Sequence, residues 1–324
     1  MNYGDLIKDA FWITLRNRYL WFFGFFTAGT SANFNVPSVP SGSFDGFDNN
    51  DFERRASMPV VLAQVGQDAL GEVSLIVAIV ALVVLIVLIF IILSLISHGA
   101  LAESVAALDR GEHRRFASTW RAGVSNFWGV LAYFVLFILI ALGFLLAIGV
   151  PLVLLVAGVY FGTQSSGAMI LTIVLAALVG FGLLIVVFVP LSIVAQFALR
   201  EIVVRREGVV GSIGSGYQLF RRNLGRSLLI WLIQLVIWIG AGIVLLFLLL
   251  LLGLILFLPT IFLAIAEYVT AALTTGIVAG LILLALLFVS YGALGTFNHS
   301  YWTLAYLRLN APPQEPSSQP YRGA

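Results

Sequence analysis

The stretch REIVVRREGVVGSIGSGYQLFRRNLGR, residues 200–226, separates two very long apolar blocks of the chain. It holds six of the seventeen Lys and Arg residues and ends in an arginine-flanked, aromatic-bearing segment that leads directly into the next apolar run. Similar segments precede the apolar runs that start at Tyr19 and Phe127. Cations just before a long apolar run are typical of a helix that lies on a membrane surface. The pattern predicts such a helix three times.

The composition is that of an integral membrane protein. Hydrophobic residues make up 61% of the chain and charged residues 10%, against roughly 25% charged residues in ordinary globular domains. So few charges cannot coat a soluble protein of this length, and several apolar runs exceed the ~20 residues that cross a bilayer. We therefore predict an all-α, polytopic helical bundle. The formal net charge of +2 gives no indication of a nucleic-acid partner, and the absence of Cys excludes thiol chemistry.

About six transmembrane helices are expected. Five of them are the long apolar runs at residues 73–96, 127–161, 168–199, 228–266 and 270–297. The sixth, at residues 19–30, is the weakest, because it makes only about 18 Å of helix against a hydrocarbon core of about 30 Å. Residues 1–310 are predicted to form one membrane domain with an extracytoplasmic loop at 31–58, followed by a disordered cytoplasmic tail at 311–324. The segment NHSYWTLAYLRLN after the last run is predicted to be amphipathic.

Cationic residues alternate between the two sides of the predicted spans. Fifteen of the seventeen Lys and Arg residues fall in segments 1–18, 98–125, 200–226 and 298–324. Loops that carry an excess of Lys and Arg stay in the cytoplasm. The distribution therefore predicts a multi-pass protein of the cytoplasmic (plasma) membrane with both termini in the cytoplasm.

A short motif recurs before three apolar runs. An aromatic residue and an asparagine stand six positions apart in each copy, in the pairs Phe11 and Asn17, Trp120 and Asn126, Tyr217 and Asn223. A further apolar residue lies four positions before each aromatic one: Ile7, Phe116 and Ile213. Residues four apart share one helix face, so each copy predicts an interfacial helix with an apolar stripe at the headgroup level. The asparagine lies off that stripe, where it suits an N-cap of the following transmembrane helix.

The ends of the predicted hairpins also match. HGALAE at 98–103 aligns with QFALRE at 196–201, and His299 occupies the equivalent place in the last copy. A period of about 100 residues predicts three repeats, each an interfacial helix plus a helical hairpin. With the Trp-Phe-Phe-Gly segment that begins at Trp21, these motifs make residues 1–310 resemble a family of bacterial six-helix proteins, the membrane domain of glycerophosphoryl diester phosphodiesterase. The resemblance implies a location and an architecture, not an activity, because no catalytic domain is found beside it.

No catalytic, cofactor or metal site is predicted. Four polar residues would meet at the cytoplasmic rim if the repeats packed around a common axis: His98, His299, Glu103 and Glu201. If they met, they could form a metal site. The other interpretation is that these residues are polar helix ends that face headgroups or water. The acidic residues between Asp45 and Glu53 lack the Gly and the final Glu of a calcium-binding loop, so a solvated loop is favoured there.

Arginine clusters supply the candidate binding residues. Seven arginines beside the predicted membrane surface form these clusters: Arg114, Arg115, Arg205, Arg206, Arg221, Arg222 and Arg226. A cation near a charged leaflet contributes about 1 kcal/mol to the attraction of anionic headgroups. We therefore regard these residues as candidate contacts of anionic lipids.

The predicted spans contain no Asp, Glu, Lys or Arg, which disfavours ion-coupled transport. Four polar residues of the spans are expected to join helices by hydrogen bonds: Gln234, Thr172, Ser192 and Ser290. A ladder of small residues is expected to form a close packing seam: Ala272, Gly276 and Gly280. Pro151 and Pro190 imply kinks on neighbouring spans that could face one another and line a cavity.

The sequence favours a non-enzymatic membrane protein that organises or assists membrane protein partners, whose identity it does not give. A carrier or binder of lipids or small amphiphiles, with the kinked helices as its groove, is the alternative from a different functional class. A membrane enzyme is disfavoured because no catalytic motif is found.

Overall fold

The computed structural model of the protein describes residues 2–28, 67–162 and 166–311, and every regular element in these ranges is an α-helix. The predicted loop at 31–58 and the tail from residue 312 onward lie outside the described residues. The chain divides into two compact units, Met1–Asn33 with Ser94–Ala324, and Phe34–Leu93. The helices are α1 (Tyr3–Arg16), α2 (Leu20–Ala28), α4 (Gln67–Asp109), α5 (Phe116–Ser125), α6 (Phe127–Gly162), α7 (Ser166–Val204), α8 (Val209–Arg222), α9 (Leu224–Ile265) and α10 (Val269–Asn310).

Five of the described helices are long and apolar enough to cross a membrane: α4, α6, α7, α9 and α10. The predicted class, a polytopic helical membrane protein, is therefore confirmed. The weakest predicted crossing begins in α2, which has nine residues and is about 14 Å long at 1.5 Å per residue. That length is well short of a ~30 Å hydrocarbon core. The described part of α2 does not by itself supply a sixth span.

The end of α10 differs from the sequence prediction. α10 continues without a break to Asn310, and all the residues from 298 to 306 are buried. The predicted amphipathic segment in this region is therefore wrong. The physical reason is that α1, α2, α7 and α9 all contact α10, so every face of this part of the helix meets protein and none is left for a membrane surface.

Each of the three short helices α1, α5 and α8 ends at the asparagine of the repeated motif. The side-chain amide donates to the carbonyl oxygen four residues earlier, at 2.9 Å for Asn17, 2.8 Å for Asn126 and 3.3 Å for Asn223. The predicted N-cap role is wrong, because each asparagine side chain bonds back to the last turn of the short helix, to the same carbonyl oxygen that accepts its own backbone N–H. Asn223 does occupy the N-cap position of α9, but its side chain makes no capping bond there.

Each short helix packs on the end of a long helix. An added Cβ on Gly123 of α5 would stand 2.4 Å from the carbonyl oxygen of Ile96 in α4, and one on Gly216 of α8 would stand 3.0 Å from the α7 backbone. α1 packs on α10, where Asp9 pairs with Arg308. α5 and α8 thus pack on the long helix that precedes each of them in the chain, whereas α1 packs on the last long helix, α10.

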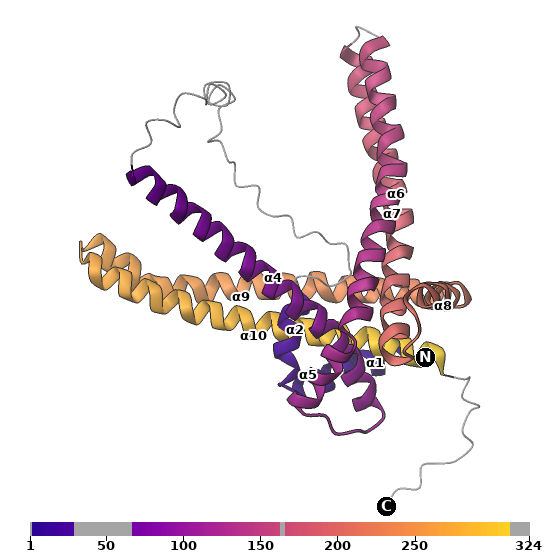
Figure 1. Ribbon diagram of the computed structural model, residues 1–324, viewed down its shortest axis with the longest axis horizontal. Helices are drawn as coiled ribbons and strands as arrows, with labels where there is room; N and C mark the ends of the chain where they lie inside the picture. Colours follow the sequence, from indigo (N-terminus) through magenta and orange to yellow (C-terminus); the bar gives the residue numbers. More distant parts are fainter. Residues whose placement is uncertain (1, 29–66, 163–165, 312–324) are drawn as a thin grey trace, which may run out of the picture. The chain divides into compact units, whose positions relative to one another are not determined.

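The long helices pair in sequence order. α6 and α7 lie side by side, as do α9 and α10 (Figure 1). An added Cβ on Gly180 of α7 would stand 2.7 Å from the Leu152 side chain of α6, which sets the register of that pair. Pro151 therefore lies near the level of Gly180, about ten residues or ~15 Å from the level of Pro190. The expectation that the two proline kinks face one another is wrong.

Polar side chains join α9 to α10. Gln234 of α9 donates from Nε2 to Oδ1 of Asn298 in α10 at 2.6 Å, which confirms the predicted role of Gln234. Thr172 and Ser192 instead donate to carbonyl oxygens of their own helix α7, so the prediction is wrong for these two. The Tyr301 hydroxyl donates to the carbonyl oxygen of Ile230 at 2.9 Å. Such bonds hold polar groups that have no access to water in a bilayer.

A glycine seam joins α2 to α10. An added Cβ on Gly24 would stand 2.1 Å from the carbonyl oxygen of Gly292, and one on Gly295 would stand 2.0 Å from the carbonyl oxygen of Gly24. Only glycine permits backbones to approach this closely. The small-residue ladder predicted on α10 does not form a comparable seam, because Gly276 contacts α9 but a Cβ on Gly280 would meet nothing within 4 Å.

Candidate functional site

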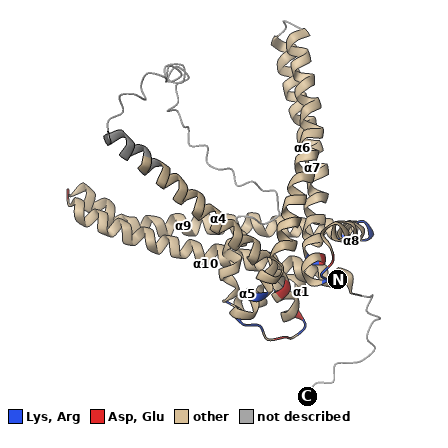
Figure 2. Ribbon diagram, in the orientation of Figure 1, with Lys and Arg blue, Asp and Glu red and all other residues tan. Residues whose placement is uncertain are grey.

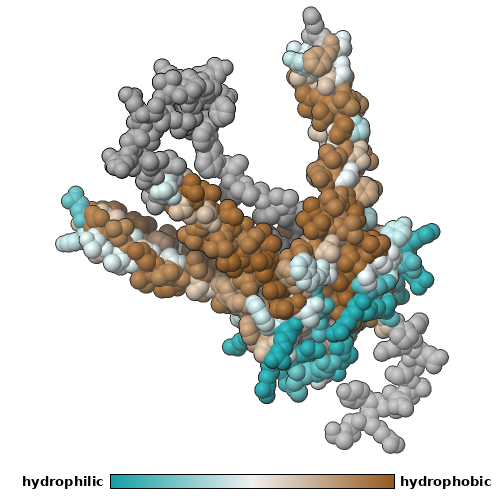
Figure 3. Space-filling view, in the orientation of Figure 1, coloured by the Kyte–Doolittle hydropathy of each residue, from teal (hydrophilic) through white to brown (hydrophobic). Residues whose placement is uncertain are grey.

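Charged side chains gather at one end of the helical pairs. Figure 2 shows Lys, Arg, Asp and Glu near α1, α5 and α8. α6 contains none, and those of α7, α9 and α10 stand near one end of each helix: Arg200, Glu201, Arg226 and Arg308. In the space-filling view the same division appears as a hydrophilic end and long hydrophobic arms (Figure 3). Large apolar side chains on those arms are exposed, such as Phe181 and Phe247, each at 67%. Such surfaces fit lipid, so binding residues are expected at the charged end.

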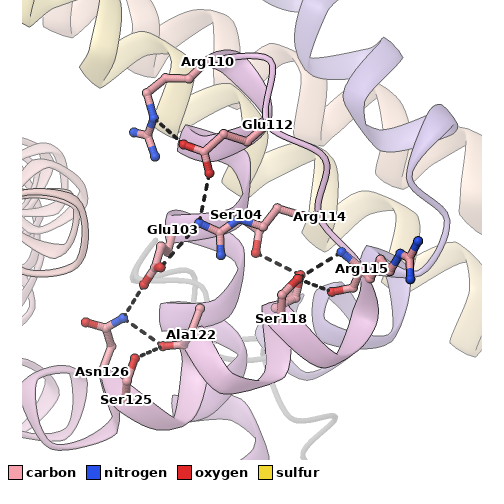
Figure 4. A network of polar contacts seen from close by, with 11 residues as sticks. Glu103, Ser104, Arg110, Glu112, Arg114, Arg115, Ser118, Ala122, Ser125 and Asn126 are labelled. Carbon is pink, nitrogen blue, oxygen red and sulfur yellow. Dashed lines mark hydrogen bonds and ion pairs between the residues drawn. The ribbon is translucent and has the colours of Figure 1, made fainter.

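A chain of polar contacts runs across the corner between α4 and α5 (Figure 4). Arg114 Nη2 lies 3.8 Å from Glu103 Oε1 and 3.3 Å from Glu112 Oε2. The other Glu112 oxygen accepts a hydrogen bond from Arg110 Nε at 3.0 Å. This bond holds the pKa of Glu112 below its ordinary value. Asn126 Nδ2 donates to Glu103 Oε2 at 2.8 Å, so the motif asparagine is part of this corner.

The start of α5 is fixed by side-chain hydrogen bonds. The Ser118 hydroxyl accepts from the Arg115 backbone N–H at 3.0 Å and donates to the Arg115 carbonyl at 2.8 Å. The buried Ser104 hydroxyl of α4 donates to the Thr119 hydroxyl of α5 at 3.0 Å. These bonds hold the arginines at the start of α5 in a defined position relative to α4.

Two cavities share Arg114 and Glu103 in their walls. The larger has a volume of about 670 Å³ and is lined by Glu103, His113, Arg114, Arg115, Ala117, Ser118, Arg121, Ala122 and Ser125. The smaller has a volume of about 220 Å³ and is lined by Glu103, Ala106, Arg110, Arg114, Val203, Val204 and Arg206. Each cavity presents three guanidinium groups and one carboxylate. Guanidinium groups in such numbers favour carboxylate and phosphate ligands.

The seven predicted cationic residues fall into two groups. Arg114, Arg115 and Arg206 line the cavities. The other four lie elsewhere on the charged end, where Arg205 pairs with Glu201 at 3.5 Å and the rest occupy the last turn of α8 or the first turns of α9: Arg221, Arg222 and Arg226. The sequence prediction missed Arg110 and Arg121. Their position in the same arginine-rich segment of the sequence could have suggested them. Only the packing of the helices shows that they line a cavity.

The aromatic residues of the motif occupy two different environments. Phe11 and Tyr217 are half exposed, at 51% and 53%, as expected for side chains that face a headgroup layer. Trp120 is partly buried instead, with its ring 6.3 Å from that of Phe23 in α2. The protein-facing side of α1 and α8 is a different face, which buries small residues such as Ala10 and Gly216 together with large apolar ones.

The ends of α7 and α10 enclose a fully buried arginine. Arg200 is 0% exposed and donates to the carbonyl oxygen and the side-chain oxygen of Gln196. Its Nε donates to the Thr303 hydroxyl at 3.4 Å, and its Nη2 has no hydrogen-bond partner among the described residues. Within the described ranges no carboxylate comes within ion-pair distance of Arg200. A guanidinium stays charged in proteins, so this position is costly to stability.

The four polar residues that were considered as a possible metal site come together only in part. His98 and His299 meet, with ring centroids 4.8 Å apart. Glu103 is held by Asn126 and Arg114, however, and Glu201 pairs with Arg205. In the described part of the chain, no three His, Cys, Asp or Glu side chains are grouped as metal ligands.

A family model matches residues 18–309 of the chain, and it describes DUF7544, a family of unknown function. The chain belongs to this family. No curated protein and no solved structure is found to be similar. The comparisons do not link this DUF7544 member to the membrane domain of glycerophosphoryl diester phosphodiesterase, so that resemblance carries no further argument. DUF7544 covers almost all of the described helices, including the α4–α5 corner.

Proposed function

We propose that the protein is a non-enzymatic membrane organiser that gathers anionic lipids, and with them membrane protein partners, at its charged end. The observation that carries this proposal is the pair of cavities beside Arg114, each of which is lined by three arginines and one glutamate. They lie at the ends of helices that are long enough to cross a membrane. A cation in such a place attracts anionic headgroups by about 1 kcal/mol.

The proposal includes six spans, arranged as three repeats of an interfacial helix and a helical hairpin, in the cytoplasmic membrane. Support comes from the equal asparagine caps of α1, α5 and α8. Further support comes from the packing of each short helix on the end of a long helix. In this arrangement α2 begins the first hairpin, and both termini lie in the cytoplasm with the arginine-rich turns.

Reporter fusions test this topology. Fusions after Glu112 and Gly208 are expected to report the cytoplasm, because arginine-rich turns are retained there, and a fusion after Glu267 is expected to report the outside. A fusion after Ser43 is expected outside as well. A cytoplasmic signal at Ser43 alone would contradict the six-span count, because Ser43 and Glu112 would then lie on the same side and α4 between them could not cross. Reversed signals at all four sites would contradict the orientation.

Lipid analysis of the purified protein tests the organiser function. We expect protein that is extracted in mild detergent to retain anionic phospholipids at a higher proportion than the source membrane, and to crosslink reproducibly to the same few membrane proteins. Mass spectrometry of the bound lipids and crosslinked peptides measures both. A lipid profile equal to that of the source membrane, with no recurrent protein partner, would contradict the proposal.

A lipid carrier is the second candidate, and one observation favours it. The arm formed by α6 and α7 holds an apolar groove of about 700 Å³, lined by residues on both helices that include Gly149, Leu152, Met169 and Phe181. Such a groove accepts an acyl chain. A carrier would transfer a fluorescent phospholipid between donor and acceptor vesicles faster than the spontaneous rate, whereas an organiser would bind lipid and leave that rate unchanged.

A further inference from the structure

The smaller cavity beside Arg114 has a composition that points to one kind of ligand. Its walls come from segments far apart in the sequence, the end of α4 with the turn that follows it and the end of α7 with the turn before α8. Three cations and one carboxylate give it a formal charge of +2: Arg110, Arg114, Arg206 and Glu103. The rest of the wall is formed by small aliphatic residues, Ala106, Val203 and Val204.

We propose that this cavity binds the phosphate group of an anionic phospholipid headgroup, with Glu103 accepting a hydrogen bond from a headgroup hydroxyl. The inference rests on the proposed function, and it names the site and the headgroup chemistry. Its volume of about 220 Å³ is below the ~300 Å³ at which pockets for whole small molecules begin. A headgroup phosphate fits this volume while the acyl chains remain in the membrane.

Arg114 keeps hydrogen-bonding capacity for such a ligand. Its contacts with Glu103 and Glu112, at 3.8 Å and 3.3 Å, are longer than the ~2.7–2.9 Å of a strong charged hydrogen bond. The group has five N–H donors, and it remains about one fifth exposed. The two carboxylates therefore position the Arg114 guanidinium but leave it with N–H donors that can bind a phosphate in the cavity.

Arg206 reaches the same cavity from an unusual backbone conformation. Its φ is 55°, in the left-handed region that costs a non-glycine residue about 1–2 kcal/mol. Strain of this kind persists where the surrounding structure fixes it, often at ligand-binding positions. The adjacent Arg205 pairs with Glu201, whereas the side chain of Arg206 lines the cavity. The turn thus presents one arginine to the cavity and leaves the other in an internal ion pair.

Glu103 decides the kind of headgroup. One of its oxygens accepts from Asn126 at 2.8 Å and the other faces Arg114 at 3.8 Å. An ionised carboxylate has about four acceptor positions, so it can also accept from a hydroxyl. It disfavours the second negative charge of a phosphate monoester, because like charges repel. A phosphodiester with a glycerol hydroxyl, such as phosphatidylglycerol, matches these preferences.

Native mass spectrometry of the delipidated full-length protein tests the site. The titrants are phosphatidylglycerol, phosphatidic acid, phosphatidylcholine and the soluble compound glycerol 3-phosphate. We expect Arg114→Gln/Arg206→Gln to weaken phosphatidylglycerol binding at least about tenfold, because it removes two charged hydrogen-bond donors from the phosphate. The matched control is Arg221→Gln/Arg222→Gln, which removes the same charge from the last turn of α8 and is expected to change binding less than about threefold.

Two further variants keep the test decisive. Arg206→Gln alone alters an exposed residue, so it gives a stable protein with weakened binding even if the double variant folds poorly. Glu103→Gln keeps the size of the side chain and is expected to reduce the preference for phosphatidylglycerol over phosphatidic acid, because the carboxylate no longer repels the second phosphate charge. An unchanged preference in Glu103→Gln would contradict the role of Glu103.

The outcomes separate the site from the general function. An equal loss in the α8 control pair would overturn the site and leave a diffuse cationic surface, which is still compatible with the proposed function. Absence of any preference for phosphatidylglycerol over phosphatidylcholine in the unaltered protein would overturn both. Binding of glycerol 3-phosphate as tight as that of the lipid would assign the cavity to a soluble phosphate and overturn the lipid assignment.

Discussion

Gly295→Ala is expected to destabilise the protein strongly. The added Cβ would stand 2.0 Å from the carbonyl oxygen of Gly24, a backbone atom that cannot rotate away. Overpacking of this kind costs about 1–3 kcal/mol and more where backbones must separate, which exceeds the ~1 kcal/mol that Ala gains over Gly in a helix. We expect a lower apparent melting temperature and a lower yield of monodisperse protein, measured by thermal unfolding and size-exclusion chromatography in detergent.

Gly280→Ala is the matched control in the same helix. A Cβ at Gly280 would meet nothing within 4 Å, so the variant is expected to be as stable as the unaltered protein or slightly more stable, because of the higher helix propensity of Ala. Equal stability of the Gly295 and Gly280 variants would show that α2 and α10 do not meet at the glycine seam. Because that seam holds α2 beside α10, its loss is expected to affect the whole first hairpin.

Arg200 should give opposite results with two substitutions. Arg200→Ala removes one of the largest fully buried side chains and leaves a cavity beside Gln196 and Thr303, so we expect a loss of about 2–4 kcal/mol of stability. Arg200→Met fills most of the same volume and removes a buried charge that no described carboxylate neutralises. Replacing a buried ion by an apolar side chain is often neutral or stabilising, so Arg200→Met is expected to unfold at or above the temperature of the unaltered protein.

Arg222→Met is the control for the loss of a cation alone. Arg222 lies exposed in the last turn of α8, where its removal is expected to have little effect on stability. If Arg200→Met proved as damaging as Arg200→Ala, the Arg200 charge would have to be compensated by a group bound in the membrane.

The sequence alone determined which segments are long helices and where the charges lie. In a bilayer each backbone N–H and C=O must be satisfied within its own segment, so a run such as residues 127–161 predicts α6 almost to the residue. The ends of the short helices could also be predicted, because Asn17, Asn126 and Asn223 mark a change from a mixed to an apolar pattern. The direction of their side-chain bonds could not, because the same amide can cap the helix before it or the helix after it.

Tertiary structure alone decided which helix ends pack together and which arginines share a cavity. A neighbouring helix and a lipid chain are both apolar, so no local pattern shows that residues 298–306 are enclosed by protein on every side or that Gly24 meets Gly295. The same holds for charges. Arg206 is about ninety residues from Arg114 in the chain, and the two line one cavity because the ends of α4 and α7 come together there. The hydrophobic pattern fixes each helix in the membrane, but the close fit of side chains between helices fixes the site.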